Sequence, residues 1–388
     1  MSPAASKFID LARWIATLLV ALHHTHNVFV NHADIMSAPH AWPVYIWWFI
    51  TAFPIGHAGL VMFFVISGFL VGGLLVEKVR AGKPFLRNYF IDRTIRINIV
   101  LYPALVLTLL LDNVGAKIFP GPDLLHIVSQ GDGSTATTFV ANLFNLQGIW
   151  FSPFGSNGPL WSLGVEFWYY MIAPLLLLPL SAAYAKGWRI AAFALGLVLF
   201  VVMTASGSYF VFGFWLWCLG ALVRLAPRPL MRSRWLALAL WLAAVCVLRL
   251  VVRLPAADAF PQKYIVDFIT SLLFANLLLT LQFDKVGFAW ARSDFHKKFA
   301  DFTYSIYATH LPVAVWMAGV AALIYGVGWR RELATPLHYV WTIGSVGIMV
   351  LVGYLLSRVT EEKTGAVRQW ARRALPGGPP ARGGAEKA

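Results

Sequence analysis

Charged residues are scarce in this sequence. Asp, Glu, Lys and Arg make up 12% of its 388 residues, whereas 59% are hydrophobic; a soluble domain carries about 25% charged residues. Cysteine is scarcer still, because only Cys218 and Cys246 occur, both within apolar segments. Two such residues exclude a disulfide framework and a cysteine-rich zinc site. With no repeat of fixed period and no sign of a second domain, the composition points to an integral membrane protein.

Apolar runs of about twenty residues recur along the whole chain, and each is long enough to cross a bilayer as a helix. They predict an all-α polytopic membrane protein with about ten transmembrane helices. A further segment, 41–54, is rich in Trp and is expected to form an interfacial helix. The ten predicted spans are 10–30, 58–77, 97–113, 160–182, 189–206, 208–225, 235–252, 264–283, 303–326 and 338–358.

The formal net charge of +14 is concentrated in short basic clusters between the apolar runs. This placement is typical of the positive-inside rule and argues against a nucleic-acid partner, which needs a continuous basic face. Segment 78–96 holds six basic residues and 114–159 holds only Lys117. We therefore expect both termini in the cytoplasm and 114–159 as an external loop. Residues 1–360 form one transmembrane domain, and 361–388 a cytoplasmic tail that is disordered from about 374, where Pro and Gly dominate.

The first predicted span contains Arg13 and His24, two side chains that are costly to bury in hydrocarbon. They are eleven residues apart, which is about 16 Å along a helix and close to three turns, so both project from nearly the same face. Arg13 could instead be an anchor at the membrane interface, and His24 a packing histidine. His23 and His26 share a face and raise a metal or haem site as an alternative, but no third ligand has matching spacing.

Glu166 is the one acidic residue in the apolar run that begins near Trp161. In the predicted orientation it lies in the outer half of the membrane with His24. A carboxylate at this depth could orient the imidazole or hold a sugar hydroxyl. A structural role as partner of Arg13 or of a histidine is the alternative.

Arg93 and Arg96 lie one turn apart at the inner edge of the third predicted span. Two guanidinium groups on one face suit phosphate recognition, and anchoring to lipid headgroups is the competing explanation. In the second span, Gly68 and Gly72 predict close helix packing beside Ser67. His310 lies in the middle of the ninth span.

Four segments, taken in order, resemble the acyltransferase-3 family of membrane enzymes. IDLARWIATLLVALHH resembles the family's first helix, in which an Arg and a His are separated by ten residues, here Arg13 and His24. FFVISGFL, WSLGVEFWYYMIAP and YSIYATHLPV are similar to three further family segments, with Glu166 and His310 on family Glu and His positions. The sequence departs from the family at Asp92, where an Arg is common, and at Phe167, where a second Glu is common.

The resemblance implies transfer of an acyl group, usually acetyl, from coenzyme A to a hydroxyl. His24 would be the general base or a transient acyl acceptor, with Arg13 and Glu166 as further catalytic residues, and Arg93 and Arg96 would bind the donor. Acyl-CoA would be a co-substrate, with no permanently bound cofactor and no metal. Further substrate-binding candidates are Ser67, Trp161 and His310.

The resemblance also implies a glycan or glycolipid acceptor on the outer side of the bilayer, here taken as a bacterial inner membrane. A proton-coupled transporter or flippase is the main rival, because intramembrane His and Glu also suit a proton relay. A haem or quinone redox protein is a third reading. The acceptor sugar, the acyl chain, the choice between acyl-histidine and direct transfer, and the oligomeric state stay open.

Overall fold

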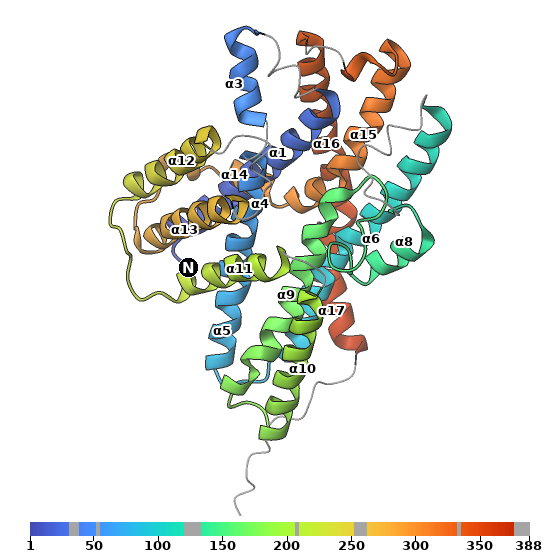
Figure 1. The fold of residues 1–388 in the computed structure, drawn as a ribbon. Helices are drawn as coiled ribbons and strands as arrows, with labels where there is room; N and C mark the ends of the chain where they lie inside the picture. The colour runs from blue at the N-terminus through green and yellow to red at the C-terminus, as the bar shows by residue number, and fades with distance from the viewer. Residues whose placement is uncertain are drawn as a thin grey trace, which may run out of the picture.

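The structure, a computed structural model of the chain, describes residues 1–30, 39–51, 55–119, 133–205, 209–251, 262–331 and 335–375. These residues form helices and contain no β-strand (Figure 1). The helices are α1 (Pro3–Phe29), α3 (Trp42–Thr51), α4 (Ile55–Ser67), the π-helix η1 (Gly68–Gly72), α5 (Gly73–Arg80), α6 (Leu86–Ile118), α8 (Ala136–Leu143), η2 (Gly158–Leu160), α9 (Trp161–Leu177), η3 (Leu178–Leu180), α10 (Lys186–Thr204), α11 (Tyr209–Leu225), α12 (Arg234–Val251), α13 (Gln262–Phe283), η5 (Ala289–Ala291), α14 (Asp294–Ala300), α15 (Thr303–Tyr325), η6 (Trp329–Arg331), α16 (Pro336–Val359), η7 (Glu361–Lys363) and α17 (Thr364–Ala374).

Each of the ten predicted spans coincides with a helix or a run of consecutive helices. Among the described residues, seven of these helical segments are long and apolar enough to cross a membrane. The remaining three predicted spans correspond to α1 and to the shorter apolar helices α11 and α12. The fold is therefore an all-helical membrane domain, and the full count of ten crossings stays a prediction.

Basic connections that lie far apart in the sequence meet at one end of the helical bundle, which we call the basic end. Arg224 at the end of α11 pairs with Glu77 of α5 at 2.9 Å, and Arg234 at the start of α12 pairs with Asp284 after α13 at 2.8 Å. Arg87 of α6 donates to the last carbonyls of α17. The segments expected in the cytoplasm thus share one end, as alternating helices require, while the side of the membrane on which this end lies stays a prediction.

The two most enclosed spans are α15 and the α4–η1–α5 segment, each with 78% of its apolar window buried, against 17% for α10. A helix that is apolar all round and buried belongs to the centre of a bundle. Helices α1 and α6 pack against these central segments. The residues predicted to carry chemistry on α1, α4, α6 and α15 therefore face the middle of the protein.

Close approach of α11 to η1 depends on glycine, as the Gly68 and Gly72 pattern predicts. A Cβ at Gly68 would lie 1.8 Å from the carbonyl oxygen of Trp217, and one at Gly220 would lie 2.0 Å from that of Val65. The local π-helix, a feature often found at functional sites, follows directly after Ser67. Packing at this point brings Ser67 into the interior.

One predicted boundary differs from the structure. Helix α6 starts at Leu86 and continues to Ile118, so the expected loop 114–159 begins inside a helix, and it also contains the helix α8. The tail predicted from 361 was expected to be disordered only from about 374, and before that point it contains η7 and α17. Residues 120–132 and 376–388, which include most of the segment expected to be disordered, lie outside the described residues.

Candidate active site

A cavity of about 300 Å³ lies between α1, α4, α6, α9 and α15. Five residues singled out in the sequence contribute to its wall: Arg13, Ser67, Arg93, Arg96 and Glu166. Apolar side chains from α4 and η1 complete the lining on one side. An amphipathic pocket of this kind, with a few polar groups on an apolar wall, is typical of a small-molecule site.

Glu166 ends a directed chain of hydrogen bonds. The Tyr170 hydroxyl donates to Glu166 Oε1 at 2.5 Å, so its oxygen is left to accept from Ser67 Oγ, 2.9 Å away. Trp217 Nε1, which is only a donor, supplies the Ser67 oxygen at 3.1 Å. Three successive donations thus hold the Glu166 carboxylate at the cavity wall as an acceptor.

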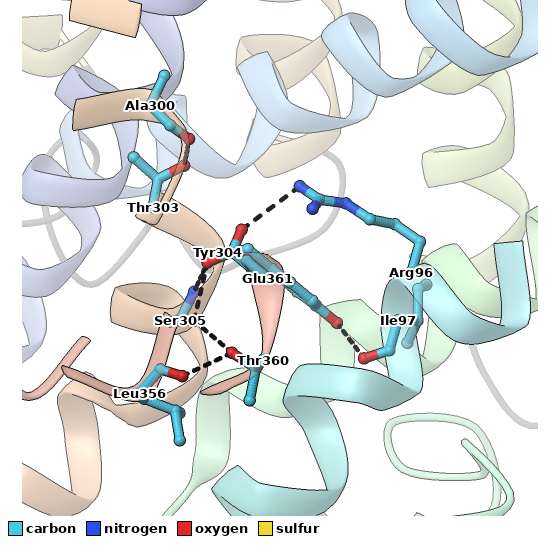
Figure 2. Close-up of polar contacts among 9 residues, drawn as sticks. All are labelled: Arg96, Ile97, Ala300, Thr303, Tyr304, Ser305, Leu356, Thr360 and Glu361. Carbon is cyan, nitrogen blue, oxygen red and sulfur yellow. Dashed lines mark hydrogen bonds and ion pairs between the residues drawn. The ribbon is translucent and has the colours of Figure 1, made fainter. Parts of the chain in front are cut away.

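Arg96 is held by a carboxylate from η7 and an aromatic ring from α15 (Figure 2). Its Nη2 lies 3.5 Å from Glu361 Oε1, and its guanidinium carbon lies 5.6 Å from the centre of the Tyr304 ring. Glu361 also accepts from the backbone N and the hydroxyl of Ser305, at 3.1 and 2.8 Å. Tyr304 donates to the carbonyl of Ile97 at 3.0 Å (Figure 2). This network fixes the part of the cavity wall that Arg96 and Tyr304 form.

Arg93 is positioned differently, between two aromatic rings. Its guanidinium carbon lies 5.9 Å from the ring centre of Tyr89 and 5.8 Å from that of Tyr170. Its Nε is buried and forms no hydrogen bond with the described residues. Arg13 completes the group, within electrostatic range of Arg96 and Glu361. The cavity therefore carries three guanidinium groups and has donors available for an anionic ligand.

His24 pairs with His310 outside the cavity lining. The rings stack with centres 5.0 Å apart, and His24 Nδ1 lies 2.7 Å from His310 Nε2. His310 Nδ1 lies 2.7 Å from the Tyr307 carbonyl, which only accepts, so this nitrogen carries a proton. A neutral His310 then accepts at Nε2, and His24 donates from Nδ1. His24 is left with a lone pair on Nε2, the state that a general base needs.

Tyr307 joins the histidine pair to the cavity. Its ring contributes to the cavity wall, its carbonyl accepts from His310, and its hydroxyl lies 2.7 Å from Ser162 Oγ. On α1 the cavity wall ends at Thr17, seven residues before His24, or about 10.5 Å along the helix. The site therefore has two parts, an arginine-rich cavity toward the basic end and a histidine pair about two turns farther from that end.

Comparison with known proteins identifies the family of the chain. The profile of a family of acyltransferase domains, acyltransferase-3, matches residues 6–359. The chain belongs to the acyltransferase-3 family. An uncharacterised protein of Haemophilus influenzae is 30% identical over 151 residues, which cover 37% of this chain and 58% of that relative. No solved structure matches the chain.

Two candidate residues of this membrane acyltransferase make contacts that the sequence did not predict. Trp161 does not line the cavity; its ring packs edge-on against Tyr209, with centres 5.4 Å apart. Glu166, which could have oriented His24, bonds to Tyr170 instead, and His310 holds the imidazole. Beside it, Phe167 packs against Trp168, so no second carboxylate stands there.

His23 lies beside this pair, with its ring centre 5.3 Å from that of His24, but it makes other contacts. It is buried, it bonds to Asn27 at 3.2 Å, and its Cβ and ring approach the backbone of Gly56. Within the described part of the chain, no group of three or more His, Cys, Asp or Glu side chains is arranged to hold a metal ion.

Several residues at the site were not found from the sequence. Tyr170 and Tyr304 fall within segments that resemble the family, but aromatic residues are so frequent here that neither stood out. Glu361 falls in the predicted tail, after the last apolar run, where a carboxylate is ordinary. Each gains its role through a contact with a helix that is distant in the chain.

Proposed function

We propose that this acyltransferase transfers an acyl group, acetyl in the simplest case, from coenzyme A to a hydroxyl of a glycan or glycolipid. The donor would enter from the basic end, taken as cytoplasmic, and the acceptor from the opposite side of the bilayer. The observation that carries the proposal is the order of the site: guanidinium groups in a cavity nearer the basic end, and a histidine with a basic Nε2 beyond it. A donor as long as coenzyme A needs such an order, because its phosphate groups bind at one place and its thioester reacts at another.

His24 would carry out the proton transfers of the reaction. Its Nε2 removes the proton from the acceptor hydroxyl, and the oxygen attacks the thioester carbonyl. The C–S bond then breaks, and the coenzyme A sulfur takes the proton back from Nε2. In the covalent variant, Nε2 attacks the thioester first, and the C–S bond breaks to release coenzyme A as a thiolate. The acyl group then passes to the hydroxyl oxygen, whose proton is taken up by that thiolate. His310 would hold the ring in the reactive tautomer during both routes.

The cavity residues would bind and align the donor. Arg93 and Arg96 would contact its phosphate groups, for which guanidinium is well suited, and Arg13 would add positive charge along the path to His24. Glu166 would accept a hydrogen bond from an amide or hydroxyl of the pantetheine arm, because its carboxylate is already fixed as an acceptor by Tyr170. Burial of the arm among Leu60 and its apolar neighbours would supply further binding energy.

Incubation of the purified protein with labelled acetyl-CoA separates this proposal from a transporter. The enzyme consumes the donor and transfers label to an added glycolipid or polysaccharide, whereas a carrier in vesicles takes up substrate without any donor. Label that stays entirely on coenzyme A, together with uptake independent of it, would reject the proposal. Mass spectrometry of surface glycans, with and without the gene, would then identify the acyl group and the acceptor.

A further inference from the structure

Helix α17, which the sequence placed in the tail, is fastened to the first turns of α6. Asp92 of α6 accepts hydrogen bonds from Arg372 Nη2 at 2.6 and 2.8 Å, and Arg368 Nε lies 3.9 Å from the same carboxylate. Arg87 Nη2 donates to the carbonyls of Arg372 and Leu375, both at 2.6 Å. A cation at the C-terminal carbonyls of a helix is stabilising. Helix α17 therefore has a defined place at the basic end.

This attachment brings five cations together beside the arginine-rich cavity. Arg368 lies within electrostatic range of Arg93, Arg96 and Arg372, and Lys78 within range of Asp92, Arg93 and Arg372. Lys78, Asp92 and Arg93 also border one small recess between α5 and α6. Three carboxylates lie near these five cations, namely Asp92, Glu361 and, in the cavity wall, Glu166, so the cluster keeps a net positive charge.

Ion pairs hold the cluster together, but they do not use all of its N–H donors. Arg93 Nε and Arg368 Nε are both buried and form no hydrogen bond with the described residues. Buried guanidinium donors are normally hydrogen-bonded, and a cluster of like charges repels itself unless an anion compensates it. Arg372, whose side chain is 42% exposed, has room to turn from Asp92 toward a ligand. The cluster thus has the charge, the donors and the access that a phosphate group requires.

We propose that α17 is part of the donor site: Arg368 and Arg372, held by Asp92 in the unliganded protein, contact the phosphate groups of the bound nucleotide together with Arg93. The inference rests on the proposed function, because it names further residues of the same donor site. In the unliganded protein, the Asp92 carboxylate occupies the place of a phosphate group and holds the two arginines. When the nucleotide binds, its phosphate groups, which carry more negative charge, replace Asp92 as the partner of these arginines. A bidentate guanidinium–phosphate contact is strong enough for this exchange.

The proposal predicts opposite effects on coenzyme A binding when the positive or the negative charge of the Asp92–Arg372 pair is removed. Arg368→Gln/Arg372→Gln removes two phosphate ligands and should weaken binding of coenzyme A roughly tenfold or more. Asp92→Asn removes a competing anion and should leave binding unchanged or tighter. Arg373→Gln is the matched control, because it makes the same change on the neighbouring exposed residue of α17 and should leave affinity unaltered.

The experiment measures binding of coenzyme A and of pantetheine, which lacks the phosphates, to the full-length protein and each variant in neutral-lipid nanodiscs. Thermal unfolding is recorded for every sample. The proposal expects losses for coenzyme A alone, at unchanged unfolding temperature. Equal losses in Asp92→Asn and the double variant would overturn it, since the pair would then act only by holding α17. Coenzyme A affinity in the double variant equal to that of Arg373→Gln would also overturn it.

Two further outcomes show whether the proposed function or only the present inference has failed. If the wild-type protein binds coenzyme A no better than pantetheine, the proposed function fails and this inference with it, whereas normal wild-type binding with unaffected variants rejects the inference alone. Anionic lipid headgroups also offer phosphate. Nanodiscs that contain phosphatidylglycerol therefore form a separate arm, and a loss of lipid binding without a loss of coenzyme A binding would assign the arginines to the membrane.

Discussion

His310 fixes the tautomer of His24 from a position 286 residues away in the chain. The Tyr307 carbonyl sets the proton on His310 Nδ1, and this in turn sets the proton on His24 Nδ1. Carboxylates usually orient a catalytic histidine, and the sequence offered Glu166 for that task. In this protein a neutral ring holds His24, which adds no negative charge beside it.

The first prediction compares His24 with its neighbour His23. His24→Ala should lower the transfer rate at least about 100-fold, because general acid–base catalysis typically contributes about 10²–10⁴-fold. His23→Ala should lower it less than about tenfold, since neighbouring residues on a helix point about 100° apart and His23 packs against Gly56. The measurement is acetyl transfer by purified protein with matched thermal unfolding. Equal damage from the two variants would contradict the assignment and favour a network that includes His23.

The second prediction concerns Arg96 and the partner that the structure gives it. Glutamine at both Arg93 and Arg96 should weaken donor binding, but Arg96→Gln also leaves the buried Glu361 without its cation. Removing one member of a buried pair is destabilising, and with Arg96 about one-third exposed we expect a loss of about 1–3 kcal/mol.

Arg96→Gln/Glu361→Gln is the control for this loss, because it removes both charges. It should recover most of the thermal stability and still bind coenzyme A weakly. Recovery of donor affinity along with stability would show that Arg96 contributes only to folding.

At the scale of elements, contact between α11 and the α4–η1 segment is set by two glycines and positions Ser67. The third prediction is that Gly68→Ala lowers thermal stability by at least about 1–3 kcal/mol, because the added carbon would overlap the Trp217 carbonyl and force two packed helices apart. Gly347→Ala on α16 is the matched change, since a Cβ there meets nothing within 4 Å. Thermal unfolding in detergent should show a loss for the first variant and none for the second.

Helix positions were predictable from the sequence, whereas their partners were not. Apolar runs mark spans because the bilayer sets their length, and the eleven-residue interval placed Arg13 and His24 on one face of α1. The face alone could not show that Arg13 lines the cavity while His24 contacts α15 beyond it. Such facts depend on which helices are neighbours, and a local pattern carries no information on that.

The start of α6 illustrates the same limit. Asp92 was seen as a departure from the family pattern, and the sequence offered no reason for it. In the structure its carboxylate bonds to Arg372 of a helix that lies 280 residues later and after the last apolar run. The unusual Asp92 and the ordered helix α17 are therefore connected, because the carboxylate of Asp92 and the arginines of α17 supply the opposite charges of one ion-paired group.

At the scale of the whole molecule, the fourth prediction concerns orientation. The basic end gathers the connections after α5, α11 and α13 and the helix α17, and the positive-inside rule puts such an end in the cytoplasm. A reporter fused after Lys363 should therefore read cytoplasmic. One inserted near Gly131, which lies outside the described residues, should read external.

Fusion after Lys363 removes α17, so a second fusion after Ala388 retains the full chain and tests the same end with its ion pairs intact. Both fusions should agree. If the Gly131 site reads cytoplasmic instead, the arginine-rich cavity would face the outer side, and a cytosolic nucleotide could not reach it. That result would reverse the direction of transfer and exclude cytosolic coenzyme A as the donor, while the His24–His310 pair and the cavity would stand as described.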